Sequence, residues 1–233
     1  MNRLIPLLIL ILFATLSRAQ NTQGYVVLES GDTLKGIVKL LDGYRSAPQL
    51  ITLEASGAAS APYYSVKECK AFAIGDDEYI RATVTMDMSY FTSIDLTILY
   101  EDSTLTQTVF LKRIYKGKNI SLLKYYDGQE LGAFRAVNVK MHFFVQDADK
   151  VQELIMKYTN APTKSVVRHF DVDRGSSAMR QIRPIFRDQL RMYFDWLTEK
   201  KLLRKLDGSD YTEYHLLKLI PLIDQKFSPI VSE

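Results

Sequence analysis

The sequence predicts an α+β protein in which an N-terminal antiparallel β-sandwich or barrel-like domain is followed by a small C-terminal helical region. From residue 24 to about residue 146, turn-forming residues recur mostly every 11 to 18 residues, and the segments between them alternate apolar and polar side chains. After residue 160 the apolar residues recur at spacings of three and four instead. The 233 residues are 47% hydrophobic and 24% charged, which is enough to form a core and excludes a disordered chain.

Residues 1–19 are predicted to be a secretory signal peptide. A basic start precedes an apolar run at 4–16, and the small residues Ser17 and Ala19 predict cleavage before Gln20. As a helix, the thirteen residues of that run would rise only about 20 Å, short of the roughly 30 Å hydrocarbon core of a membrane. We therefore expect a protein that is exported from the cytosol, secretion from the cell included, with no transmembrane segment in its mature chain.

The net charge limits the classes of partner that we expect, and the cysteine content indicates how the core is stabilised. The formal net charge is +3, and removal of Arg3 and Arg18 would leave 28 basic against 27 acidic residues. A nearly neutral, exported chain is not expected to bind nucleic acid. The single cysteine, Cys69, lies in a strand-like segment and is expected to be a buried hydrophobic residue, so the core should form without disulfides.

The β-domain, at residues 20–160, is expected to contain about eight to ten short strands. The clearest alternation places polar residues on one face and apolar residues on the other, namely Ile80, Ala82, Val84 and Met86. The turn at 116–119 joins two segments rich in Tyr and Leu, which predicts a hairpin.

The helical region is expected at residues 161–233, after a break at Asn160-Ala161-Pro162. Pro184 suits the first position of a helix whose buried residues would be Ile185, Phe186, Leu190, Tyr193, Phe194 and Leu197. A further helix is expected near Asp210, capped by that side chain with Glu213 reaching back, and kinked at Pro221. Its buried residues would be Leu216, Leu219, Ile220, Ile223 and Phe227.

Motifs for common catalytic chemistry are missing from the sequence. It contains no Gly-x-Ser-x-Gly elbow, no Gly-x-Gly-x-x-Gly loop and no phosphate-binding Gly-x-x-x-x-Gly-Lys loop. We therefore predict no catalytic residue and no cofactor, and favour a protein that is not an enzyme.

The strongest candidate for metal binding is the segment His169-Phe170-Asp171-Val172-Asp173. On a strand, His169, Asp171 and Asp173 would share one face and supply three ligands for a divalent ion. The segment does not fit a calcium loop: with Asp171 as position one, the sixth and twelfth positions are Ser176 and Ile182 rather than Gly and Glu. A polar strand edge or linker is the favoured interpretation. His142 and His215 are expected to be structural.

Basic side chains recur at helical spacing in the C-terminal region. They could line one helical face that meets anionic lipid, phosphate or an acidic partner; they are Arg180, Arg183, Arg187 and Arg191. Pro184 disfavours helical geometry at the residue before it, and Asp188 and Asp195 lie close enough for local pairing. A solvated face is the favoured interpretation, with anion or partner binding as the alternative.

One group of proteins shares some of these sequence features. Residues 24–36 are Gly-Tyr-Val-Val-Leu-Glu-Ser-Gly-Asp-Thr-Leu-Lys-Gly, and the later segments 110–118, 122–126 and 142–146 include a Gly-Lys turn, Leu- and Tyr-rich arms and a Phe-Phe pair. Over residues 24–146 the chain resembles a loosely defined group of exported, uncharacterised proteins of Bacteroidota-type Gram-negative bacteria. The resemblance implies a cell-envelope or periplasmic setting and transfers no catalytic residue.

The functional expectation combines export with the missing catalytic motifs. It is a non-enzymatic binding or scaffolding module whose partner is an envelope protein or outer-membrane component. The alternative is a periplasmic metal-dependent hydrolase or ligand-binding protein that uses His169, Asp171 and Asp173.

Overall fold

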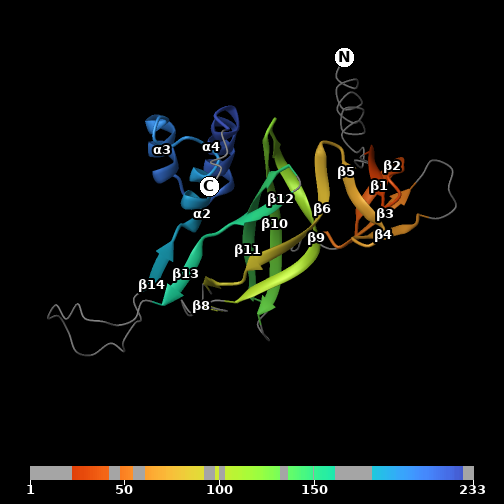
Figure 1. The fold of residues 1–233 in the computed structure, drawn as a ribbon. Coiled ribbons are helices and arrows are strands. Elements are labelled where there is room, and N and C mark those ends of the chain that lie inside the picture. Colours follow the sequence, from red (N-terminus) through yellow and green to blue (C-terminus); the bar gives the residue numbers. More distant parts are fainter. Residues whose placement is uncertain are drawn as a thin grey trace, which may run out of the picture.

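A computed structural model describes residues 23–41, 48–54, 61–91, 98–99, 103–131, 136–148, 150–160 and 180–227 of the chain. Ten strands form one antiparallel sheet in the order β12-β11-β10-β9-β6-β5-β1-β2-β3-β4 (Figure 1). They are β1 (Gln23–Leu28), β2 (Thr33–Leu40), β3 (Leu50–Glu54), β4 (Tyr63–Ser65), β5 (Cys69–Ile74), β6 (Asp77–Asp87), β9 (Thr104–Lys116), β10 (Ile120–Leu131), β11 (Ala136–Asp147) and β12 (Lys150–Leu154).

Shorter elements complete the fold. β7 (Tyr90–Phe91) pairs with β8 (Ile98–Leu99), and β13 (Lys157–Asn160) pairs with β14 (Arg180–Arg183). Three helices follow: α2 (Ile185–Arg191), α3 (Lys200–Asp207) and α4 (Glu213–Gln225). They gather at the end of the sheet that lies away from β1 to β4 (Figure 1). A long antiparallel sheet followed by helices confirms the predicted α+β class.

The sheet is strongly bent. Gln49, just before β3, donates a hydrogen bond of 3.4 Å to the Tyr125 hydroxyl on β10, although β9, β6, β5, β1 and β2 separate these strands in the sheet. The backbone N–H of Asp87, at the end of β6, likewise donates to the Glu153 carboxylate on β12, at 2.6 Å. Strands that are distant in the hydrogen-bonding order therefore meet in space.

Because successive side chains of a strand point to opposite faces, β6 and β9 contribute residues to two separate cores. Tyr79 of β6 and Phe110 of β9 point into a core with residues of β1, β2, β3 and β5. Val84 of β6 and Val109 of β9 point the other way, into a core with residues of β10 and β11. The alternation predicted for β6 is thus present: Ile80, Ala82, Val84 and Met86 face one core, whereas Thr83 and Thr85 on the opposite face are exposed.

A third core joins the helices to the sheet. Phe143 and Val145 of β11 pack with Phe186 of α2, Leu206 of α3 and Ile220 of α4. α2 and α4 therefore bury their apolar sides on the sheet, and α3 packs against these two helices. No helix in the part of the chain that the structure describes is long and apolar enough to cross a membrane.

The C-terminal region differs from the sequence expectation in its details. Residues 180–183 form a strand, and α2 starts one residue after Pro184 but ends at Arg191, well before Leu197. The Asp195 carboxylate instead accepts hydrogen bonds from the Leu197 N–H and the Thr198 hydroxyl, at 3.0 and 2.9 Å, which builds a turn there. The chain then enters α3, a helix the spacing did not predict.

The start of α4 also differs from the prediction. Its N-cap is Thr212, whose hydroxyl accepts from the His215 N–H at 3.3 Å, and Asp210 lies two residues earlier. Pro221 lies inside the helix, as expected, and four of the five apolar residues expected to be buried, Leu216, Leu219, Ile220 and Ile223, are buried.

α4 holds the turn between β9 and β10 through one carboxylate. Asp224, only 7% exposed, accepts hydrogen bonds from the backbone N–H groups of Lys118, Asn119 and Ile120 at 2.9, 2.8 and 3.0 Å. The Tyr115 hydroxyl adds a fourth, at 3.1 Å. Burial raises the pKa of Asp224, but these hydrogen bonds outweigh it and hold the pKa below its ordinary value of 3.8.

Candidate functional site: an arginine-lined hollow

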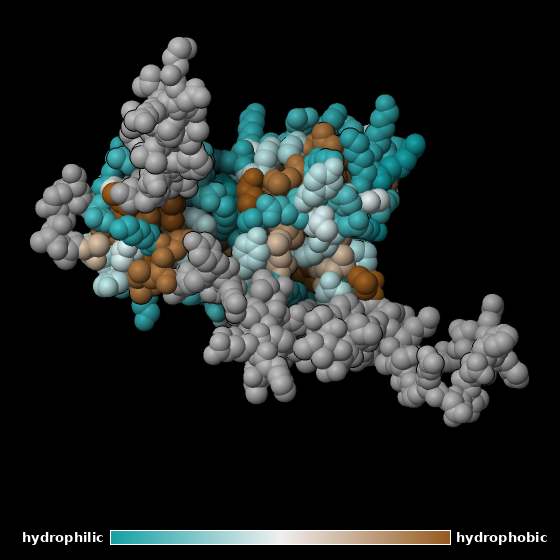
Figure 2. All heavy atoms as spheres, turned by 180° about the vertical axis from the view of Figure 1, so that it is seen from behind, coloured by the Kyte–Doolittle hydropathy of each residue, from teal (hydrophilic) through white to brown (hydrophobic). Residues whose placement is uncertain are grey.

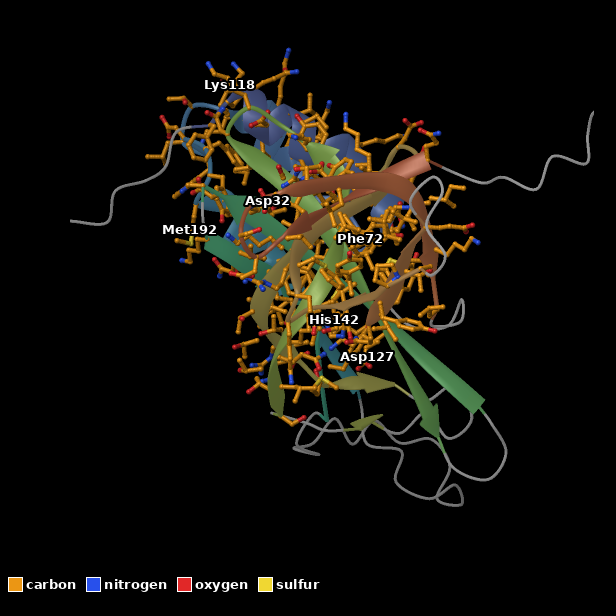
Figure 3. The ribbon with its side chains drawn as sticks, turned by 90° about the vertical axis from the view of Figure 1, so that its right-hand side faces the viewer. Asp32, Phe72, Lys118, Asp127, His142 and Met192 are labelled. Atoms are coloured by element: carbon orange, nitrogen blue, oxygen red, sulfur yellow. The ribbon has the colours of Figure 1, made fainter. Side chains whose placement is uncertain are left out.

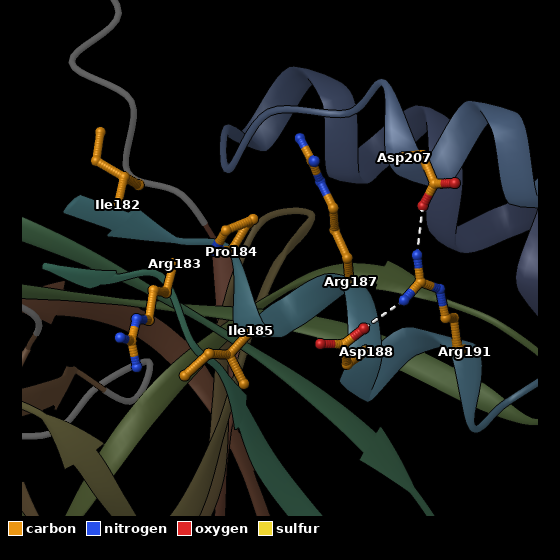
Figure 4. A pocket seen from close by; sticks show the side chains of 8 residues that line it. All are labelled: Ile182, Arg183, Pro184, Ile185, Arg187, Asp188, Arg191 and Asp207. Atoms are coloured by element: carbon orange, nitrogen blue, oxygen red, sulfur yellow. Dashed lines mark hydrogen bonds and ion pairs between the residues drawn. The ribbon is translucent and has the colours of Figure 1, made fainter.

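A hollow of about 470 Å³, open to solvent, lies where β14 passes into α2 and faces the end of α3 (Figure 4). Three arginines and two aspartates supply its charged groups. The residues that line it are Ile182, Arg183, Pro184, Ile185, Arg187, Asp188, Arg191 and Asp207. Most of the polar lining comes from the segment that the sequence singled out for its arginines.

The local fold explains why these side chains gather. The Phe186 N–H donates to the Ile155 carbonyl at 2.8 Å, which anchors the start of α2 beside β12. Phe186 and Leu190 are fully buried in the core beneath the helices. Because side chains three and four residues apart share a helix face, the burial of these two turns Arg187 and Arg191 toward the hollow.

The three arginines are held to different degrees. Arg191 pairs with Asp188 and, at 2.6 Å, with Asp207 on α3. Arg187 donates from Nη2 to the Ser209 carbonyl at 2.7 Å, while its buried Nε has no partner among the described residues. Arg183 is exposed, and no described carboxylate pairs with it. With two aspartates against three arginines, the lining carries a formal charge of +1.

The structure brings together three of the four arginines predicted from the sequence. Arg183, Arg187 and Arg191 line the same hollow. They do not lie on one helical face, because Arg180 and Arg183 belong to β14 and only the other two lie on α2. This corrects the expected basic stripe: the strand ends at Arg183 because the chain turns at Pro184. The side chain of Arg180 lies outside the described part.

The predicted metal site, His169, Asp171 and Asp173, falls on residues outside those that the structure describes, so it stays a prediction. Among the described residues, no group of three His, Cys, Asp or Glu side chains is placed to hold a metal ion. His215 lies in the first turn of α4, and its Nδ1 accepts from the Asp210 N–H at 2.8 Å.

Sequence reasoning missed a buried cluster of polar and charged side chains around His142, which is labelled in Figure 3. His142 on β11 is fully buried, and its Nδ1 lies 2.5 Å from a carboxylate oxygen of Glu153 on β12. The other oxygen of Glu153 accepts from the Asp87 N–H at 2.6 Å. The Asp87 carboxylate in turn pairs with Lys140 Nζ at 3.0 Å and accepts from the Ser89 hydroxyl at 2.6 Å.

This cluster ties the end of β6 to β11 and β12. The Nε2 of His142 is buried and has no hydrogen-bond partner among the described residues. Burial also raises the pKa of Asp127 on β10, which lies within the field of His142 and Lys140. A weak signal existed in the sequence, because Lys140 and His142 alternate with the apolar Met141 and Phe143, but the carboxylates come from distant segments.

Comparisons with known protein families, with curated proteins and with solved structures found no match for this chain.

Proposed function

We propose that this protein is an exported, non-enzymatic binding module of the cell envelope that takes an anionic group of its partner into the arginine-lined hollow. The partner would be an envelope protein or an outer-membrane component. The observation that carries the proposal is that Arg183, Arg187 and Arg191 all line one open hollow.

The arrangement of the arginines favours anion binding. The Ser209 carbonyl holds Arg187 in place, so its guanidinium loses little conformational freedom when a ligand binds. Arg183 is exposed and available. A guanidinium presents a planar fork of N–H donors that matches a carboxylate or phosphate. The two aspartates hold Arg191 and leave one net positive charge for the ligand.

The lining favours binding over chemistry. It consists of arginine, aspartate, proline and isoleucine, without a Ser, Thr, Cys, His or Lys side chain in the described part of the hollow. These are the common nucleophiles of enzymes apart from carboxylates, and the two carboxylates of the hollow, Asp188 and Asp207, are both paired with Arg191. The hollow is thus suited to hold a group rather than to transform it.

Calorimetric titration with inorganic phosphate, and in parallel with glutarate, tests this proposal. We expect weak binding of at least one of the two, and a loss of about tenfold or more in affinity for R183Q, because one charge-assisted hydrogen bond contributes roughly 1.5–3 kcal/mol. K35Q removes an exposed positive charge from β2 and should leave the affinity unchanged. Absence of binding by both anions, or equal losses in the two variants, would refute the anion site.

Export is tested separately. N-terminal sequencing of the protein recovered from the envelope or periplasmic fraction of its source cells should give a chain that starts at Gln20. Recovery of the intact chain from the cytosol would contradict the proposed location, and it would leave the anion site to be judged by the titration.

A further inference from the structure

α3 presents an almost entirely basic face to solvent. Leu202 and Leu206 are buried against the other helices. Successive residues of a helix are turned by about 100°, so the four exposed basic residues cover an arc of about 140° opposite these leucines. They are Lys200, Lys201, Arg204 and Lys205.

None of these four side chains forms an ion pair with a carboxylate of the described residues. The neighbouring acids are held elsewhere: Glu199 pairs with Lys226 at 2.8 Å, and Asp207 pairs with Arg191 at 2.6 Å. Asp195 holds the turn before α3. The positive charge of this face is therefore left for a partner outside the chain.

Exposed apolar side chains lie in the segment between α2 and α3. Met192 and Leu197 are 59% and 61% exposed, and Trp196 is 38% exposed. Lys200 Nζ lies 5.9 Å from the centre of the Trp196 ring, so the apolar turn and the basic face adjoin. The helical end is otherwise mainly hydrophilic (Figure 2), and α3 lies at its outer side, with α4 between it and the sheet (Figure 1).

A second hollow, of about 310 Å³, borders the basic face between α3 and α4. Its lining contains four basic or titratable nitrogen side chains and no carboxylate; the residues are Arg204, Lys205, Gly208, Ser209, His215, Lys218 and Leu219. A hollow of this composition suits a phosphate group.

From these observations we propose that α3 and the turn at 192–198 form a docking surface for a membrane of anionic phospholipids. Trp196, Leu197 and Met192 enter the headgroup region, and the basic face of α3 lies against the lipid phosphates, one of which occupies the second hollow. Apolar insertion together with several basic residues is the combination that holds peripheral proteins on membranes. This surface is distinct from the arginine-lined hollow and goes beyond the proposed function.

An acidic protein is the competing partner for a basic surface. It would account for the charge of α3 but not for the three exposed apolar side chains beside it. An anionic bilayer accounts for the basic charge and for the apolar side chains. Its phosphates attract the basic residues, and Trp in particular is stable at the boundary between headgroups and acyl chains.

Trp196 is the only tryptophan of the chain, so its fluorescence reports on this surface alone. The protein would be titrated with vesicles of phosphatidylcholine alone and with vesicles that contain phosphatidylglycerol. We expect a blue shift of the emission, and quenching by brominated acyl chains, only with the anionic vesicles. Lack of either signal with the anionic vesicles would overturn the proposal.

Two quadruple variants distinguish the effect of the α3 surface on vesicle binding from the effect of the overall charge. K200Q/K201Q/R204Q/K205Q should lose at least tenfold in partition to anionic vesicles, because each basic residue at a membrane surface contributes severalfold. The control K35Q/K67Q/K118Q/K150Q removes the same charge from exposed positions elsewhere and should bind like the unmodified protein. Both variants keep the apolar segment at 4–16, so any contribution of that segment to vesicle binding is the same in the two proteins. Equal losses in the two variants would refute the proposal.

L197S keeps the reporter and every charge, and it should weaken partition severalfold without a change in the salt dependence. Competition with soluble polyglutamate covers the alternative partner. If polyglutamate shifted the emission of Trp196 as the anionic vesicles do, an acidic polypeptide would replace the membrane as the partner. Thermal unfolding of each variant confirms that the comparison is between folded proteins.

Discussion

Substitution of Asp224 offers the sharpest test of how the helices and the sheet depend on each other. One carboxylate on α4 accepts four hydrogen bonds from the β9–β10 turn and its flanks. We expect D224A to lower the free energy of unfolding by about 3–5 kcal/mol, and D224N by about 2 kcal/mol. The alanine variant leaves three N–H donors without an acceptor, whereas the asparagine variant keeps one oxygen in place.

The size of this effect follows from the geometry. A hydrogen bond to a charged group contributes about 1.5–3 kcal/mol, and an unsatisfied buried donor costs about 1–3 kcal/mol. The full sum is reduced because water can reach part of the turn once the carboxylate is removed. Since a domain is stable by only about 5–15 kcal/mol, D224A would lose a large share of the total.

Urea unfolding followed by far-UV circular dichroism measures these differences. D76A, which removes an exposed aspartate from the turn between β5 and β6, is the matched control and should change the free energy by less than about 0.5 kcal/mol. If D224A were as stable as D76A, the assignment of the turn's stability to this carboxylate would be wrong.

The same carboxylate predicts a dependence on pH. Its pKa is lower in the folded protein than the ordinary 3.8, so the folded state binds fewer protons there than the unfolded state. The stability it contributes is fully present above the unfolded pKa and is lost as the pH falls through the folded pKa. Between pH 5 and pH 2.5, the unmodified protein should therefore lose more stability than D224N; equal losses would contradict the assignment.

Three further predictions rest on other buried groups. G117A should lower the melting temperature by several degrees, because a Cβ there would overlap the backbone of the turn and the α4 carboxylate beneath it; an unchanged value would show that the turn can shift. Y211F should cost about 1.5–3 kcal/mol in urea unfolding, because its buried hydroxyl donates to the Leu154 carbonyl and accepts from the Phe143 N–H. Burial raises the pKa of Cys69 to about 11, so iodoacetamide should modify the native protein far more slowly than the urea-unfolded protein at pH 8, and equal rates would contradict its burial.

The sequence predicted the alternation within single strands and one hairpin, but it did not predict how the sheet bends. Alternation in β6 and the hairpin at 116–119 depend on neighbouring residues only, and both are present. The bend that brings Gln49 to Tyr125 depends on contacts across five intervening strands, which no local pattern encodes. The buried cluster was missed for the same reason, since Asp87 and Glu153 meet only after the sheet bends.

The helical region shows how spacing can mislead. Leu197 follows Phe194 and Tyr193 at helical spacing, yet it is 61% exposed because the helix ends at Arg191 and Asp195 builds a turn. Three of the four candidate arginines line one hollow, but that hollow also depends on Asp207 of a helix that the sequence did not predict.

The alternation along β11 has a consequence for folding fidelity. Phe143 and Val145 face the helices, whereas His142 reaches the carboxylate inside the sheet. If the strand paired one residue out of place, the imidazole would enter an apolar layer and a phenyl ring would replace it beside Glu153. The imidazole and the Glu153 carboxylate would then both be buried without a partner, which is energetically costly. Because the two faces of β11 contact different surroundings, one apolar and one charged, a shifted register is less stable than the correct one. The charged cluster that stabilises the folded sheet therefore also favours the correct strand pairing.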